Sequence, residues 1–368
     1  MTNADPSRTQ TADIDIHTLP IQQRIDWLVD RACRHSLDFQ SPESSLARSR
    51  YLTQHPTAII VFSCMDGRVN IPVVTNTPHG VITPFRNLGG RFDLGWPHLG
   101  EVLAEQVQSV MRQGRRTLAL LTYHFSKGDI QRGCAGFNYD TNAARDHTFK
   151  IKRQLEAVFG ASHTAVYPIV CGFETDDDAL ILHGRDGEIM DLSTLSEADH
   201  DRLPMLLARL YPDMAEQILL DLMPLVRDNI IHIAAAKQTS RDLTIAHREW
   251  IICIGRGFEW LHMPRVALII GPYSPNLADP IRKAGEIVED NMRAGRIPDD
   301  GFLLFAEAPY KEVGIDRVRS ELKGRFLSEF AANVIHTEFP YLSEKMQVRT
   351  AVLAWQTRMM EMLDGRAA

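Results

Sequence analysis

The sequence predicts an α/β protein with a mostly parallel sheet flanked by helices. Short β-branched apolar runs alternate with amphipathic segments of helical spacing, which is the pattern of βαβ units. A similar pair of apolar runs recurs in the later half of the chain and indicates two related halves, the second of them degenerate. A chain of 368 residues is long enough for two cores.

Residues 1–52 are expected to form an N-terminal helical extension. One amphipathic segment in this region has apolar residues at helical spacing, namely Ile21, Ile25, Leu28, Val29 and Ala32. We expect this helix to pack against the body of the protein.

Residues 57–62 and 117–123 are apolar runs that predict two buried strands, with a helix over 99–111 between them. A βαβ connection makes such strands parallel and brings their carboxyl ends to the same edge of the sheet. Side chains that follow the two strands should therefore meet. Three further elements are expected: a helix over 142–159, a strand over 165–171 and its hairpin partner over 179–183.

Three candidate metal ligands follow these first two strands. Cys64 comes just after the first strand, His124 ends the second, and Cys134 lies ten residues further on. Two thiols and one imidazole form a donor set that zinc prefers, and three protein ligands leave the fourth tetrahedral position open for water. An open position indicates catalysis.

Asp66 and Arg68 lie in the same loop as Cys64, at an i, i+2 spacing. The guanidinium can hold the carboxylate ionised and oriented, so that it can act on a water molecule at the metal. Both are candidate catalytic residues.

These motifs together resemble the β-class carbonic anhydrases, whose signature is a Cys-x-Asp-x-Arg loop followed by a distant His and a second Cys. Here the loop reads Cys64-Met65-Asp66-Gly67-Arg68. Most members of the class carry His-x-x-Cys, whereas His124 and Cys134 are ten residues apart. This long loop, together with residues 167–179 and 254–260, resembles the carboxysomal shell carbonic anhydrase.

The resemblance implies one zinc ion per chain, bound by Cys64, His124 and Cys134. It implies a lyase that reversibly hydrates CO₂ to bicarbonate, with a zinc-bound hydroxide oriented by the Asp66–Arg68 pair. A homodimer or higher homo-oligomer is also implied. The carboxysomal relatives carry a much larger helical domain before the catalytic part, for which this chain has too few residues, so association with a carboxysome shell is not expected.

The second half is expected to lack metal ligands. Residues 266–276 can be laid on 58–68 and residues 302–309 on 117–124. The residues that replace the ligands and the catalytic pair are then Pro272 for Cys64, Ser274 for Asp66, Asn276 for Arg68 and Pro309 for His124. We therefore expect a zinc-binding catalytic domain over 53–200 and a degenerate repeat over 201–368.

Three other features have a functional and a simpler interpretation. The stretch Arg86-Asn87-Leu88-Gly89-Gly90 is similar to a motif that lines the cleft of the β class, or is merely a loop with flexible glycines. His247 is a candidate catalytic residue that could bind bicarbonate or relay protons, although most histidines are structural or exposed. The run Asp176-Asp177-Asp178 is interpreted as a solvated turn between two strands.

Composition excludes several classes of function. The net charge of −7 argues against a nucleic-acid partner, and no apolar run approaches the roughly 18 residues of a membrane span. The first residues show no secretory signal, and five scattered cysteines do not resemble a disulfide framework. We expect a cytoplasmic protein in which Cys33, Cys171 and Cys253 act as small apolar residues.

Two other functions remain open at this stage. An enzyme on the same scaffold could hydrolyse carbon disulfide or carbonyl sulfide, which differ from CO₂ in size and polarity. A non-catalytic zinc-containing scaffold protein is the other alternative, although a structural site would not need Asp66 and Arg68.

Overall fold

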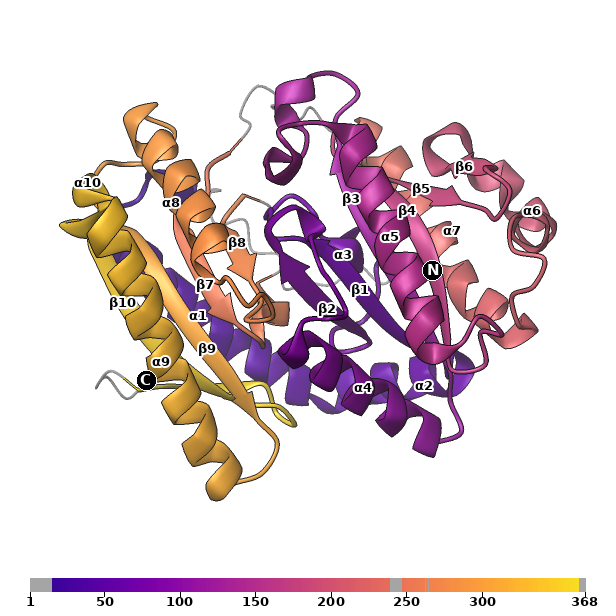
Figure 1. Cartoon of the computed structure of the whole chain (residues 1–368), viewed down its shortest axis with the longest axis horizontal. Coiled ribbons are helices and arrows are strands. Elements are labelled where there is room, and N and C mark those ends of the chain that lie inside the picture. Colours follow the sequence, from indigo (N-terminus) through magenta and orange to yellow (C-terminus); the bar gives the residue numbers. More distant parts are fainter. Residues whose placement is uncertain (1–14, 239–246, 262, 264, 364–368) are drawn as a thin grey trace, which may run out of the picture.

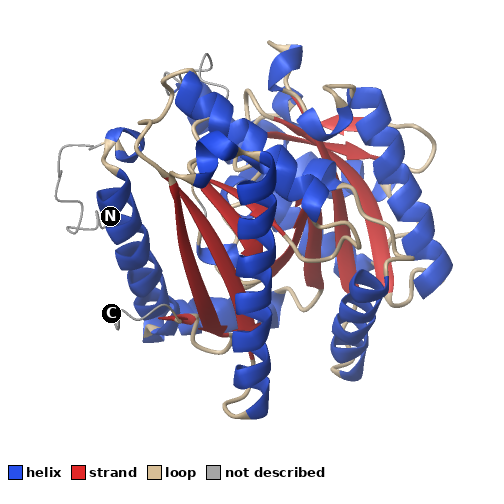
Figure 2. Ribbon diagram, turned by 60° about the vertical axis from the view of Figure 1, so that its left-hand side comes forward, coloured by secondary structure: helices blue, strands red, loops and turns tan. Residues whose placement is uncertain are grey.

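The computed structural model describes residues 15–238, 247–261, 263 and 265–363. It contains two mostly parallel sheets flanked by helices, which confirms the predicted fold class (Figure 1). Helices cover the sheets on the outside of the molecule in Figure 2. None of the helices in the described residues is both long enough and apolar enough to cross a bilayer.

The first sheet has the order β2-β1-β3-β4-β5-β6. Its first four strands are parallel, and the last two close one edge in antiparallel fashion. The strands are β1 (Ala58–Cys64), β2 (Ile82–Asn87), β3 (Thr117–Phe125), β4 (Val166–Glu174), β5 (Ala179–His183) and β6 (Ile189–Asp191). The helices of this half are α3 (Ile71–Val74), α4 (Pro97–Arg112), α5 (Thr141–Phe159), α6 (Leu203–Leu210) and α7 (Glu216–Gln238).

The second sheet has the order β11-β10-β9-β7-β8, again parallel except for its last hairpin. The strands are β7 (Ile251–Gly255), β8 (Ala267–Ile270), β9 (Phe302–Tyr310), β10 (Met346–Ala354) and β11 (Met359–Met362). Three helices accompany them, α8 (Ala278–Arg293), α9 (Ile315–Glu338) and α10 (Pro340–Ser343).

The strands and helices expected around the first half are confirmed. Local signals account for their ends: α4 begins with Pro97, whose missing amide hydrogen is no loss in a first helical turn. The Asp140 side chain accepts a hydrogen bond from the Ala143 amide and starts α5, and Gly160 ends that helix with a φ of 91°. The hairpin of β4 and β5 also forms as expected.

The two halves share one topology, because β8-β7-β9-β10-β11 repeats the order β2-β1-β3-β4-β5. The register agrees as well. Ile59 of β1 pairs with Ile82 and Leu118, as Ile251 of β7 pairs with Ala267 and Leu303. The counterpart of β1 is therefore β7.

The alignment of residues 266–276 with 58–68 is wrong for this reason. Both β2 and β7 were missed as strands, so β8, the counterpart of β2, was matched to β1. Counting from the paired positions, Arg256 rather than Pro272 corresponds to Cys64, with Phe258 and Trp260 matching Asp66 and Arg68. The match of Pro309 to His124 is correct, because it agrees with the pairing of β1 with β3 and of β7 with β9.

The N-terminal helices α1 (Ile21–Gln40) and α2 (Pro42–Gln54) run along one side of both halves (Figure 1). Helix α1 packs on β11 and β9, as expected for a helix against the body. Its buried Arg24 donates to Asp300 at 2.5 Å and to the Gly301 carbonyl at 3.1 Å. Residues 1–14 of the expected extension lie outside the described residues. Helix α7 packs against β5 of the first sheet, and α6 packs against α7.

Candidate metal centre

Cys64, His124 and Cys134 meet at the carboxyl edge of the first sheet. A donor atom from each lies within 4.8 Å of the others, and all three side chains are buried. A zinc ion with bonds of about 2.0–2.3 Å needs donors roughly 3.3–3.8 Å apart, so a small adjustment would suffice. The group could hold a metal ion.

The strand register brings the first two donors together. Phe62 of β1 pairs with Leu121 of parallel β3, so the chain positions that follow on both strands lie at one edge. Cys64 ends β1, and His124 lies one residue before the end of β3. The expected meeting of these residues, 60 positions apart, is thus a consequence of the βαβ topology.

The loop from β3 to Cys134 is held by carboxylates of the β4–β5 turn. Asp176 accepts hydrogen bonds from the Ser126 hydroxyl at 2.9 Å and the Gly128 amide at 2.7 Å, and pairs with Arg132 at 2.9 Å. The buried Glu174 accepts from the Lys127 amide at 3.0 Å. Residues 176–178 do lie in the turn between β4 and β5, as expected, but Asp176 is not merely solvated: its carboxylate anchors the loop that delivers Cys134.

Two glycines complete the placement of Cys134. A Cβ on Gly136 would lie 2.6 Å from the Cα of Gly89, far inside van der Waals contact. Gly89 itself has a φ of 66°, which side chains disfavour. The stretch 86–90 therefore shapes the site through backbone contact, since only glycines allow the two loops to approach so closely.

Both ring nitrogens of His124 are buried without a hydrogen-bond partner among the described residues. The Asp66 Oδ2 atom lies 3.9 Å from Nε2. An unpaired buried polar group costs about 1–3 kcal/mol, and native proteins rarely leave one. A metal bond to the imidazole would offset that cost, so the donor set fits a metal ion.

The two thiols influence each other strongly. A hydrogen bond from Cys134, together with the charge of His124, lowers the pKa of Cys64 well below its ordinary value against the effect of burial. The hydrogen bond to Cys64 and burial raise the pKa of Cys134. The protein alone thus stabilises one thiolate, and a cation between the sulfur atoms would stabilise both.

Asp66 and Arg68 form a bidentate ion pair beside the donors. Arg68 Nη2 donates to Oδ2 at 2.6 Å and Nε donates to Oδ1 at 3.0 Å. The Arg68 backbone amide also donates to Oδ1, at 2.8 Å. Burial alone would raise the pKa of Asp66, but Arg68 outweighs it and holds that pKa well below its usual range. The buried carboxylate is therefore ionised.

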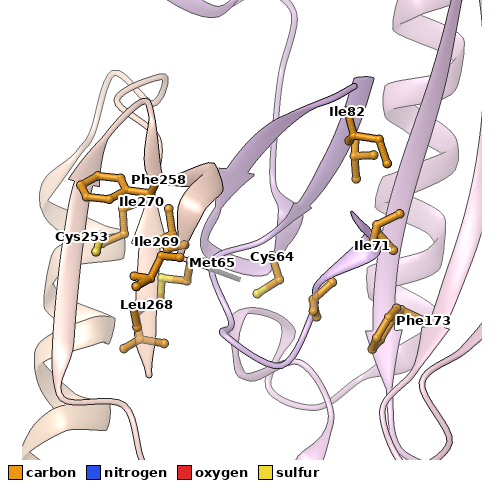
Figure 3. Close-up of a cluster of buried hydrophobic side chains, with 14 of the residues drawn as sticks. Cys64, Met65, Ile71, Ile82, Phe173, Cys253, Phe258, Leu268, Ile269 and Ile270 are labelled. Carbon is orange, nitrogen blue, oxygen red and sulfur yellow. The ribbon is translucent and has the colours of Figure 1, made fainter. Parts of the chain in front are cut away.

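The loop that carries this pair is joined to the second half. Ile269 of β8 donates its amide to the Met65 carbonyl at 2.9 Å, and a Cβ on Gly67 would lie 2.6 Å from the Ala267 carbonyl oxygen. Figure 3 shows Met65 beside Ile269, with Cys64 nearer the first sheet. Arg86 adds a hydrogen bond to the Asp66 carbonyl at 3.2 Å. The second half thus forms one wall of the site.

His247 reaches the site from this wall. Donor atoms of His247, Asp66 and Glu249 lie within 4.8 Å of one another, and His247 Nδ1 is 3.0 Å from Glu249 Oε2. Burial lowers the pKa of His247, but Glu249, followed by Asp66, outweighs it and raises that pKa. Glu249 was missed at the sequence level, since a carboxylate two residues after a histidine is a common and unspecific pattern.

The corresponding edge of the second sheet carries different chemistry. Arg256 and Pro309 occupy the positions of Cys64 and His124, and neither is a usual metal ligand. Among the described residues, the two groups of three potential donors are the ones given above.

Comparisons with known proteins identify a distant likeness among solved structures. No family model matches the sequence, and no curated protein matches it. Among solved structures, one match is titled "The structure of the beta-carbonic anhydrase CcaA", with 12% sequence identity and a TM-score of 0.34. It covers 45% of this chain and 92% of the other.

Replacing any one of Cys64, His124 and Cys134 by Ala should remove the bound metal, because each supplies one of three protein donors. The parental protein should retain one metal ion per chain after exhaustive dialysis, measured by elemental analysis. Cys171→Ala, a buried thiol outside the donor set, is the matched control and should keep its metal. Full occupancy in Cys134→Ala would refute the role of the long loop.

Asp176→Asn should weaken metal binding about 10–100-fold while leaving all three donors in place, because it loosens the loop before Cys134. Competition with a chromophoric chelator measures this affinity. Asp177→Asn, in a partly exposed pair with Lys237 at 3.6 Å, is the control and should bind metal normally. Equal affinity in both variants would show that Asp176 does not position Cys134.

Proposed function

We propose that this protein is a zinc-dependent carbonic anhydrase that reversibly hydrates CO₂ to bicarbonate. One observation carries the proposal: the Cys64, His124 and Cys134 donors lie beside an ionised, buried Asp66 that Arg68 holds in place. Thiolate and imidazole ligands favour zinc over magnesium or calcium. When bound, zinc would supply the Lewis acidity that makes water nucleophilic near neutral pH.

Asp66 has the properties of an acceptor for that water. Its Oδ2 lies 3.9 Å from His124 Nε2, so the carboxylate is next to the donor set. Arg68 keeps it ionised and prevents it from rotating freely. A carboxylate that stays ionised can accept a hydrogen bond and aim the water oxygen at the carbon of CO₂.

His247 is suited to carry the proton released by hydration. Its side chain is 15% exposed, whereas Asp66 and Glu249 next to it are buried. Glu249 accepts the proton on Nδ1 in a hydrogen bond and so fixes the ring. We assign Glu249 as a positioning residue and His247 as the group through which protons pass between the site and solvent.

The scaffold alternative is disfavoured by the same ion pair. A metal that only braced loops would gain nothing from a buried Asp–Arg pair, whose desolvation is costly. We infer an enzyme with one zinc per chain, acting in the cytoplasm and assembling with copies of itself. The absence of disulfides among its five cysteines suits the reducing conditions that thiolate ligands require.

A stopped-flow CO₂ hydration assay on the zinc-loaded protein tests the proposal. Asp66→Asn should retain zinc but lose about 10²-fold or more in kcat, because the amide keeps the shape and loses the charged acceptor. Arg68→Ala should behave similarly by freeing the carboxylate. Asp93→Asn, in a surface pair with Lys150 at 3.2 Å, should keep the parental rate. Unchanged hydration in both dyad variants would show that the pair is structural.

His247→Gln should lower kcat about tenfold at low buffer concentration and leave kcat/KM for CO₂ unchanged, because proton release follows the attack on CO₂. Added imidazole should restore the rate by replacing the lost relay. Equal losses in kcat and kcat/KM without rescue would instead assign His247 to the orientation of the reacting groups.

A further inference from the structure

A cavity of about 770 Å³ lies at the carboxyl edge of the second sheet, at the counterpart of the metal centre. Arg256 and Pro309, which match Cys64 and His124, are among its lining residues. Helix α9 contributes Arg319 and Lys323, and α4 of the first half forms another side. The second half has therefore kept a cleft where it lacks the metal donors.

Three cations in this cavity lack a carboxylate partner. Within the described part of the chain, Arg256, Arg319 and Lys323 have no acidic oxygen within 4.0 Å. The polar neighbours of two of them are uncharged side chains. Lys323 Nζ lies 3.3 Å from His98 Nε2, and Arg256 donates to the phenol oxygen of Tyr273.

The acidic residues of the cavity are engaged elsewhere or exposed. Glu105 pairs with Lys311 at 3.3 Å. Asp316 accepts hydrogen bonds from the backbone amides of Lys311 at 2.6 Å and Glu312 at 3.2 Å, at the start of α9. Glu312 is exposed. Arg256, Arg319 and Lys323 therefore have no ion-pair partner among the described residues, and the cavity lining, with four cations and three carboxylates, carries a net charge of +1.

The arginines also affect the titration of the neighbouring Lys323 and His98. Burial, followed by the charges of Arg256 and Arg319, lowers the pKa of Lys323. Burial and the charges of Lys323 and Arg256 lower the pKa of His98. Like charges in a partly enclosed space destabilise the fold, and a bound anion would reverse this effect.

We propose that the cavity binds a small organic phosphate through Arg256, Arg319 and Lys323. Two guanidinium groups and one ammonium group match a dianion better than a singly charged ion, since arginine forks hold phosphate oxygens in pairs. A single phosphate group occupies a small part of 770 Å³, a volume within the range of small-molecule sites. Tyr310 and Trp355 line the remainder and offer surface to an organic group.

Isothermal titration calorimetry with glycerol 3-phosphate tests this inference on the full, metal-loaded chain. One site per chain is expected. Arg319→Met and Lys323→Met keep most of the side-chain volume and should each weaken binding about tenfold or more, since each removes a charge-assisted contact. Arg325→Met, on an exposed part of the same helix, should bind as the parent does. Melting temperatures at or above the parental value would show that the variants fold.

Titrations with inorganic phosphate and with bicarbonate test two features of the ligand, namely its organic group and its double negative charge. Inorganic phosphate should bind more weakly than glycerol 3-phosphate, and bicarbonate more weakly still. Equal binding of the two phosphates would refute the organic ligand, and equal binding of bicarbonate would refute the preference for a dianion. Absence of binding at 10 mM glycerol 3-phosphate, or its loss on metal removal, would overturn the site itself. The test does not depend on CO₂ hydration.

Discussion

The contact between Met65 and Ile269 joins the two halves at the loop on which the candidate site depends. The Ile269 amide donates to the Met65 carbonyl, and Gly67 leaves room for the backbone of β8 to approach. The loop therefore receives support from two sheets. Cys64 at its start faces the donors of the first half, whereas Asp66 faces His247 of the second. A single first half would lack this wall and the His247 side chain that we propose as the proton relay.

The duplicated topology divides the chemistry between the halves. In the first sheet, the strand register places Cys64 near His124. The same register in the second sheet places Arg256 near Pro309. One edge has soft donors and an ionised carboxylate, and the other has cations around a cavity of about 770 Å³. The carboxyl edges of the two parallel sheets thus carry different side chains, because residues after the strands can change without altering the strands themselves.

Much of the first half could be predicted from the sequence. The apolar runs that lead to Cys64 and His124 are short but continuous, and their parallel pairing follows from the helix between them. Residues 251–255 and 82–87 were harder to identify. Buried strands of five or six residues resemble other apolar segments, and β2 contains Pro84, which disfavours a strand assignment. Missing them misplaced the counterparts of Cys64, Asp66 and Arg68.

The sequence by itself determined the fold class, the type of donors and the pairing of Asp66 with Arg68, because these depend on periodicity and on neighbours along the chain. Only the tertiary structure decided the rest. Asp176 anchors the loop before Cys134 through residues 44 to 50 positions away in the sequence, and Glu249 meets Asp66 from the other half. Such contacts depend on how sheets and loops pack, and side chains distant in sequence leave no local pattern that predicts their approach.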